Sequence, residues 1–333
     1  MRRLPNYIAL NLVLLALVAL AFLGSVYIGR GGAILVTNLH ALDAIDRSLA
    51  KLILEQVRLP RALLGLVVGA TLGMTGAGLQ GLLRNPLAEP GLIGASSGAA
   101  LGAVLVFYFG LAAGSAMLVP LGGVAGAMLS LATLYFLAGR NPSITTIILA
   151  GVAISAFASA LTSLALSLAT SPYAVYEIIF WLLGSLTDRS MVQFWFALPF
   201  IVVGLLLVAS TARALDALTL GEDTAASLGF DQQSLKLRAI LGTGLAVGAT
   251  VAVTGVIGFV GLVVPHLMRP FVGHQPGKLL LPSALAGAIL LLCADILVRL
   301  PTSGPEPKLG VITSLIGAPF FLWLILRTRR ETD

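Results

Sequence analysis

The sequence predicts an all-α, polytopic membrane protein with about ten transmembrane helices and an inverted internal repeat. Of its 333 residues, 58% are hydrophobic and only 10% are charged, and the mean hydropathy is +1.02. A soluble domain has roughly 25% charged residues, so this chain lacks the polar side chains needed to cover a globule of its size. Apolar stretches long enough to cross a hydrocarbon core of ~30 Å recur along the chain. We therefore expect one transmembrane domain, residues 1–333, without a separate soluble domain.

Hydropathy predicts nine clear spans and a shorter tenth. The first follows "MRR" and is longer than the ~7–15 apolar residues of a secretory signal, so we expect it to be retained. The tenth, "GFVGLVVPHLMRPF", contains Pro265 and is predicted to be short or broken. The predicted spans are 7–29, 61–82, 92–110, 115–138, 143–169, 191–211, 234–257, 258–271, 278–298 and 309–326.

The basic residues predict the orientation. With the N-terminus inside, twelve of the twenty Lys and Arg residues fall on the cytoplasmic side. This excess favours a topology with both termini in the cytoplasm. The basic residues behind the formal charge of +6 are spread over short loops rather than gathered in one patch. We therefore expect the chain to contact membrane lipid and not to bind nucleic acid.

The stretch 39–61 between the first two spans has helical periodicity. Its apolar residues recur on one side, and Asp43 with Arg47, like Lys51 with Glu55, are four residues apart on the other. The pattern predicts an amphipathic helix on the outer membrane surface, or simply a connecting helix.

Cysteine and histidine suggest neither a disulfide nor a metal site. Cys293 is the single cysteine, and His40, His266 and His274 are too scattered along the sequence to suggest a ligand cluster. We expect no metal ligands and no cofactor.

Two segments resemble each other within the chain. "RALLGLVVGATLGMTG" at 61–76 and "RAILGTGLAVGATVAVTG" at 238–255 share RA-x-LG, then VGAT, then TG. The first is predicted to run inward and the second outward, as in the inverted repeats of transporters.

Small residues recur every fourth position on three of the predicted helices. Glycine inside a helix costs roughly 1 kcal/mol relative to alanine, and in lipid the compensating gain is close contact between helices. The stripes predict a densely packed bundle; their members are Gly65, Gly69, Gly73, Ala77 and Gly81, then Gly94, Gly98 and Gly102, then Gly244, Gly248 and Ala252.

The stretch "RNPLAEPGLIGASSGAALG" at 84–102 interrupts this apolar pattern. Asn85-Pro86 and Glu89-Pro90 each disfavour helical geometry before the proline, so the chain is expected to turn there. Ser96 and Ser97 then open the next span among glycines, a composition typical of a helix that lines a wet or narrow passage.

These segments resemble the FecCD-type permeases, the membrane subunits of ABC importers for iron-siderophores, haem and cobalamin. The block at 58–103 is similar to the family's longest shared segment, and "ILAGVAI", "LDALTLGEDTAASLG", "GFVGLVVPHLMR", "LLCADILVR" and "LGVITSLIGAPFFLWLI" follow in the family's order. The resemblance implies a homodimer in a bacterial inner membrane. It also implies two copies of an ABC ATPase subunit and a periplasmic or lipid-anchored substrate-binding protein as partners.

The chain is not expected to be an enzyme. No Gly-x-x-x-x-Gly-Lys-Ser/Thr segment occurs in it, so ATP hydrolysis would fall to a partner. The predicted cytoplasmic loop at about 212–233 has two acidic residues after a glycine and another glycine beyond, which predicts a short capped helix. It resembles the family's ATPase-coupling helix, although by pattern alone it is a surface helix. The residues expected to couple are Leu218, Gly221, Glu222, Asp223, Ala225, Leu228 and Gly229.

The resemblance also implies sites at both mouths of a pathway. Arg58, Arg61 and Arg299 match arginines that dock the binding protein, and guanidinium groups suit such carboxylate contacts. Alternatively Arg299 pairs with Asp295. The gate at the cytoplasmic mouth is expected to comprise Asn85, Leu87, Ser143, Ile144 and Thr145, although the family has a small hydroxyl where this chain has Ile144.

Other functions remain open from the sequence. An ion-coupled secondary transporter would suit the inverted repeat, but such carriers usually have carboxylates buried in the core of the bundle. In this chain the carboxylates are expected only near the ends of the predicted spans. An intramembrane protease would need Ser96 or Ser97 with His266 as base. We expect inward transport of an iron chelate, siderophore or haem, with cobalamin as the alternative cargo.

Overall fold

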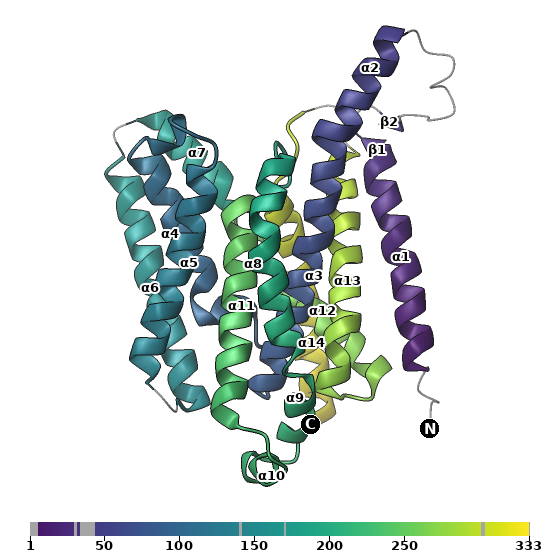
Figure 1. Cartoon of the computed structure of the whole chain (residues 1–333), viewed down its shortest axis with the longest axis vertical. Helices are drawn as coiled ribbons and strands as arrows, with labels where there is room; N and C mark the ends of the chain where they lie inside the picture. Colours follow the sequence, from purple (N-terminus) through teal and green to yellow (C-terminus); the bar gives the residue numbers. More distant parts are fainter. Residues whose placement is uncertain are drawn as a thin grey trace.

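The computed structural model describes residues 6–29, 32–33, 44–139, 142–169, 171–300 and 304–332. Among these, seven helices are long and apolar enough to cross a membrane, and three shorter apolar helices cover 95–108, 260–272 and 309–322. The helices form a bundle with roughly aligned axes (Figure 1). We call its two ends the α10 end and the α2 end after the short helices that protrude there. The predicted all-α fold with about ten spans is confirmed.

The elements follow one another through two halves of the chain. The first half contains α1 (Tyr7–Tyr27), the two-residue antiparallel strands β1 (Ile28–Gly29) and β2 (Gly32–Ala33), α2 (Ala44–Ile53), η2 (Leu54–Arg58), α3 (Leu59–Leu82), η3 (Pro90–Ile93), α4 (Ala95–Tyr108), η4 (Leu111–Ala113), α5 (Leu118–Ala138) and α6 (Ile144–Ser167). The second half contains α7 (Pro172–Leu182), α8 (Met191–Ala209), α9 (Ala212–Leu218), α10 (Glu222–Ser227), α11 (Gln232–Thr254), α12 (Val260–Met268), η5 (Arg269–Val272), α13 (Pro276–Arg299) and α14 (Leu309–Thr332).

The centre of the bundle is built on α3 and α11, which correspond to the two copies of the internal repeat. In α3 and in α11, 72% of the most hydrophobic 18-residue segment is buried inside the protein, against 17% in the peripheral α1. α3 runs from the α2 end to the α10 end and α11 runs back (Figure 1). The opposite directions are those expected of an inverted repeat.

The glycine stripes lie where helix backbones meet. A Cβ at Gly69 would lie 2.8 Å from the Cα of Ala288, and one at Gly73 would overlap the carbonyl oxygen of Ser283, both on α13. Gly98 and Gly102 of α4 face α5 in the same way. Such proximity is possible only without side chains, so the predicted close packing is confirmed.

The predicted span at 92–110 is wrong at its start. Pro90–Ile93 forms a separate 3₁₀ turn, and Gly94 has a left-handed φ of 81° before α4 begins at Ala95. α4 has 14 residues, about 21 Å of helix, which is shorter than the hydrocarbon core. A side chain at Gly94 would approach Ile154 of α6 to 2.9 Å, so α6 packs directly on this break.

The predicted amphipathic helix also takes another form. Residues 39–43 lie outside the described residues, and from Ala44 the helix continues through η2 into α3 without leaving helical geometry. It extends beyond the bundle along the line of α3 (Figure 1), so a separate helix lying flat on the surface is wrong. The predicted Lys51–Glu55 pair is present at 3.8 Å.

Two short helices were not predicted from the sequence. α7 begins with Pro172 in its first turn, a recognisable start signal, and it is held by Ile178 and Trp181, which are buried. α9 precedes α10 in the predicted coupling loop and buries Leu215 and Leu218. The loop is therefore a pair of helices rather than one.

Candidate functional site

The segment α9–α10 protrudes at one end of the bundle (Figure 1). Gly221 starts α10 with φ 111°, Glu222 and Asp223 occupy its first turn, and Gly229 follows its end with φ 88°. Acidic residues in the first turn of a helix offset its positive end. The predicted capped helix is confirmed, between two glycines whose backbone conformations disfavour other residues.

The predicted coupling residues separate into two groups. Ala225 and Leu218 are buried against the bundle and anchor the segment. Leu228 is 59% exposed and the neighbouring Leu220 is 64% exposed. The anchored side chains fix α10 on the bundle, and the two exposed leucines provide an apolar surface directed away from it.

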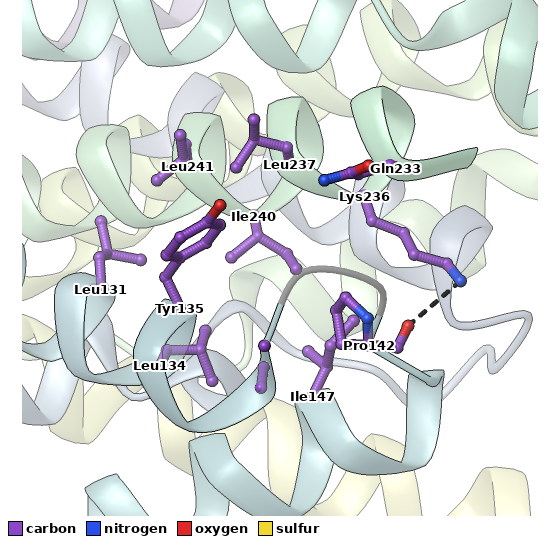
Figure 2. Close-up of a pocket in the computed structure, with 12 residues that line it drawn as sticks. Leu131, Leu134, Tyr135, Pro142, Ile147, Gln233, Lys236, Leu237, Ile240 and Leu241 are labelled. Carbon is purple, nitrogen blue, oxygen red and sulfur yellow. Dashed lines mark hydrogen bonds between the residues drawn. The ribbon is translucent and has the colours of Figure 1, made fainter. Parts of the chain in front are cut away.

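Lys236 of α11 connects α10 to the beginning of α6. Its Nζ lies 3.8 Å from a carboxylate oxygen of Glu222. It also donates a hydrogen bond of 3.3 Å to the carbonyl of Pro142, which Figure 2 shows. Its side chain borders an apolar pocket between α5, α6 and α11 (Figure 2). The pocket is lined mainly by aliphatic side chains and Tyr135, namely Leu131, Leu134, Ile147, Leu237, Ile240 and Leu241.

The predicted gate residues come from two segments at this end. Ser143 is the N-cap of α6, and its Oγ accepts a hydrogen bond of 3.0 Å from the amide of Thr146. Ile144 is half-buried and Thr145 is exposed. Asn85 closes its own turn by accepting a 2.9 Å hydrogen bond from the Leu87 amide.

The two gate segments lead into η3 and α6, which pack together further into the bundle. η3 lies against α6, where a side chain at Gly151 would overlap the carbonyl of Leu92. Ser96 and Ser97 are half-buried in the first turn of α4. The gate role of all these residues stays a prediction.

Two polar residues that hold this region were missed from the sequence. The carboxylate of Glu89 accepts a hydrogen bond of 2.8 Å from the amide of Phe259, whose φ is 67°. The buried Gln80 accepts one of 2.6 Å from Arg269. Both partners lie more than 150 positions away along the chain, so no local pattern could indicate them.

At the α2 end, the three predicted docking arginines are buried inside the protein. Arg61 is 6% exposed and its Nη2 lies 2.9 Å from Asp295, while its Nη1 lies 3.2 Å from Glu306. Arg299 is 3% exposed and its Nη2 lies 2.9 Å from the other oxygen of Asp295. The predicted Asp295–Arg299 pair is thus confirmed, with Arg61 as a third member.

Other contacts bind this arginine cluster to α1. Arg299 donates to the carbonyl and the hydroxyl of Ser25, at 2.9 and 2.7 Å. Arg58 donates to the carbonyls of Val26 and Tyr27, at 3.2 and 2.7 Å. Among the described residues the cluster has three arginines and two carboxylates, so it carries a net positive charge. Docking by these arginines stays a prediction.

Comparisons place the chain among transport proteins. The model of the FecCD transport family matches residues 12–327. The vitamin B12 import system permease protein BtuC of Salmonella paratyphi A is 38% identical over 281 residues, which cover 84% of this chain and 85% of that protein. The hemin transport system permease protein HmuU of Yersinia pestis is 41% identical over 283 residues, 83% of each chain. A solved structure described as an inward-facing metal-chelate type ABC transporter has a TM-score of 0.84 and 31% identity, and the match covers 96% of this chain and 99% of that one.

Proposed function

This chain belongs to the FecCD transport family of ABC importer permeases, and from that premise we propose that it carries an iron chelate, a siderophore complex or haem, inward across a bacterial inner membrane. We propose that it works as a homodimer with two ATPase subunits and a substrate-binding protein, and that its α10 end and both termini lie in the cytoplasm. The observation that carries the proposal is the exposed α10 with its connection through Lys236 to α6.

The residues of the chain fit a transporter that is driven by a partner ATPase rather than by an ion gradient. Its sequence contains no Gly-x-x-x-x-Gly-Lys-Ser/Thr segment, so in this proposal a partner subunit hydrolyses ATP. Among the described residues the most deeply buried carboxylate, Asp295, is already neutralised by Arg61 and Arg299. A neutralised carboxylate is poorly suited to bind the driving ion of a secondary transporter.

The contacts suggest how ATPase movement reaches the gate. A partner that grips Leu220 and Leu228 would displace α10 together with Glu222. Lys236 contacts both Glu222 and the carbonyl of Pro142, so displacement of α10 changes the position of the residues that start α6. Those residues include the predicted gate residues Ser143 to Thr145.

Replacing Lys236 with methionine is expected to reduce ATP-driven uptake about fivefold or more, the size of a typical coupling between sites. Methionine keeps the apolar stem against the pocket but removes both polar contacts. Uptake and ATPase activity should be measured together in proteoliposomes, where hydrolysis is expected to continue without matching transport. Lys278→Met, an exposed lysine at the same end, is the matched control. Equal uptake by wild type and Lys236→Met would contradict the coupling route.

At the opposite mouth, we propose that the net positive arginine cluster attracts acidic lobes of the binding protein. Arg58 is the best candidate for direct contact because its hydrogen-bond acceptors among the described residues are two carbonyl oxygens rather than carboxylates. Guanidinium groups form stronger hydrogen bonds with carboxylates than with neutral carbonyls, so an acidic partner would compete for Arg58. Arg61 and Arg299 would serve mainly to join α3, α13 and the segment before α14.

The cargo is tested by reconstitution. Liposomes containing this chain, its ATPase and its binding protein should accumulate a ferric siderophore or haem, supplied one at a time, only when ATP is present. Preferential uptake of cobalamin would favour the alternative that the similarity to BtuC supports. Uptake that continues without the ATPase and stops with an ionophore would instead identify a secondary transporter.

A further inference from the structure

A separate cavity of about 340 Å³ opens at the α10 end. It lies between the end of α3, the joint between α9 and α10, and the turn that joins η5 to α13. Its lining consists of Gln80, Gly81, Arg84, Pro86, Thr219, Arg269, His274, Pro276 and Leu279. The volume is several times the ~30 Å³ that a water molecule occupies in the liquid, so the cavity has room for a small polyatomic group.

The polar lining of this cavity is basic. It has two arginines and a histidine and no acidic side chain. Among the described residues, neither Arg84 nor Arg269 lies within 4.0 Å of a carboxylate oxygen. The nearby Asp216 is not among the residues that line the cavity, and its Oδ1 accepts a 2.8 Å hydrogen bond from the amide of Gly277. The lining therefore carries a net positive charge, with no ion pair to either arginine among the described residues.

The side chain of Arg269 is held in place by a hydrogen bond to Gln80. Its Nη2 donates to Oε1 of Gln80 at 2.6 Å. The amide nitrogen of Gln80 is fixed in turn by the carbonyls of Gly261 and Leu262, at 3.4 and 3.3 Å. A guanidinium group has five N–H donors, and the contact with Gln80 uses one. Arg269 is thus pre-oriented and retains donors for a ligand.

The other two basic residues occupy backbone positions that favour glycine. Arg84 has φ 49° and His274 has φ 63°, both in the left-handed region. Each lies at a helix end closed by a hydrogen bond over five residues, from Asn85 to Gln80 and from His274 to Arg269, both 3.2 Å. Glycine would adopt these conformations without steric cost, so both side chains are kept against a local preference.

We propose that this cavity binds the phosphate group of an anionic ligand. Arg84 and Arg269 would donate to the phosphate oxygens, and His274 would add a further donor. The group could come from a free phosphate compound or from a phospholipid headgroup, which share this chemistry. Because Thr219 in the wall precedes α10, an occupied cavity would fix α10 relative to α3 and α13. The inference concerns a site that the transport proposal does not use, and it does not depend on the cargo.

The experiment uses the full chain, purified in a neutral detergent. Inorganic phosphate is expected to raise its Tm more than chloride at equal ionic strength. In Arg269→Gln and in Arg84→Gly the phosphate concentration for half the effect should increase about tenfold or more. Arg84→Gly also relieves the left-handed backbone, so its Tm without phosphate should not fall. Arg213→Gln, an exposed arginine of α9 outside the cavity, is the matched control for charge.

A second arm distinguishes the two sources of phosphate. Nanodiscs containing phosphatidylglycerol are compared with nanodiscs of phosphatidylcholine alone. Stabilisation by phosphatidylglycerol that requires Arg84 and Arg269 identifies a lipid headgroup, and an effect of inorganic phosphate alone identifies a soluble ligand. The proposal is wrong if neither inorganic phosphate nor phosphatidylglycerol stabilises the wild type. It is also wrong if Arg269→Gln, Arg84→Gly and Arg213→Gln all respond to phosphate alike.

Discussion

Replacing Asp295 with alanine is expected to lower the free energy of unfolding by about 3–5 kcal/mol, the usual cost of breaking a buried ion pair. Asp295 is 1% exposed and lies 2.9 Å from both Arg61 and Arg299. The substitution leaves two buried guanidinium groups in a cluster that already has more positive than negative charges. The Tm in detergent and the yield of monodisperse protein would measure the loss.

The control for this substitution is an ion pair in solvent. Lys51 and Glu55 lie 3.8 Å apart with side chains 74% and 50% exposed, so Glu55→Ala should change the stability by no more than about 0.5 kcal/mol. A double substitution of Asp295→Ala and Arg299→Met should cost less than the sum of the two single ones, because it also removes one unpaired charge. Strict additivity of the two, or a Tm unchanged by Asp295→Ala, would contradict the structural role given to this cluster.

Replacing Gly73 with valine is expected to destabilise the bundle by about 3 kcal/mol or more, at the upper end for overpacked cores. The new Cβ would overlap the carbonyl oxygen of Ser283, which belongs to the backbone of α13 and cannot move aside as a side chain can. The helices would have to separate and lose their contacts along this seam. Most of the protein should then aggregate on extraction, as size-exclusion chromatography would show.

Gly91→Ala is the matched control for this prediction. A Cβ at Gly91 meets no atom within 4 Å, and Gly91 does not have a left-handed backbone. This variant should therefore retain wild-type yield and Tm. If Gly73→Val behaves like Gly91→Ala, then α3 and α13 do not pack as closely as described.

The sequence predicted what depends on local pattern. Apolar runs define spans by their length, and the spacing of Gly69 and Gly73 indicates a contact face before the partner helix is known. α10 was also predicted, because Gly221, the acidic first turn and Gly229 are neighbours in the chain. Such signals lie within one or two helical turns, where residues act on each other directly.

What the sequence did not predict depends on residues that meet only after folding. Arg61 and Arg299 lie at span ends, where long cationic side chains commonly extend into water, so they were expected to be accessible. Their burial requires Ser25 from α1 and Glu306 from the segment before α14, both more than 200 positions from at least one arginine. The contact of Glu89 with Phe259 is of the same kind. α7 was missed because its 11 residues are too few for a span, and its place depends on burying Trp181.

The contact between α3 and α13 limits which movements a transport cycle can use. Backbone atoms of the two helices touch at Gly69 and Gly73, so neither can slide or rotate against the other without collision. The pair must therefore travel as one rigid body. Any alternation between inward and outward opening therefore has to bend the chain outside this pair of helices.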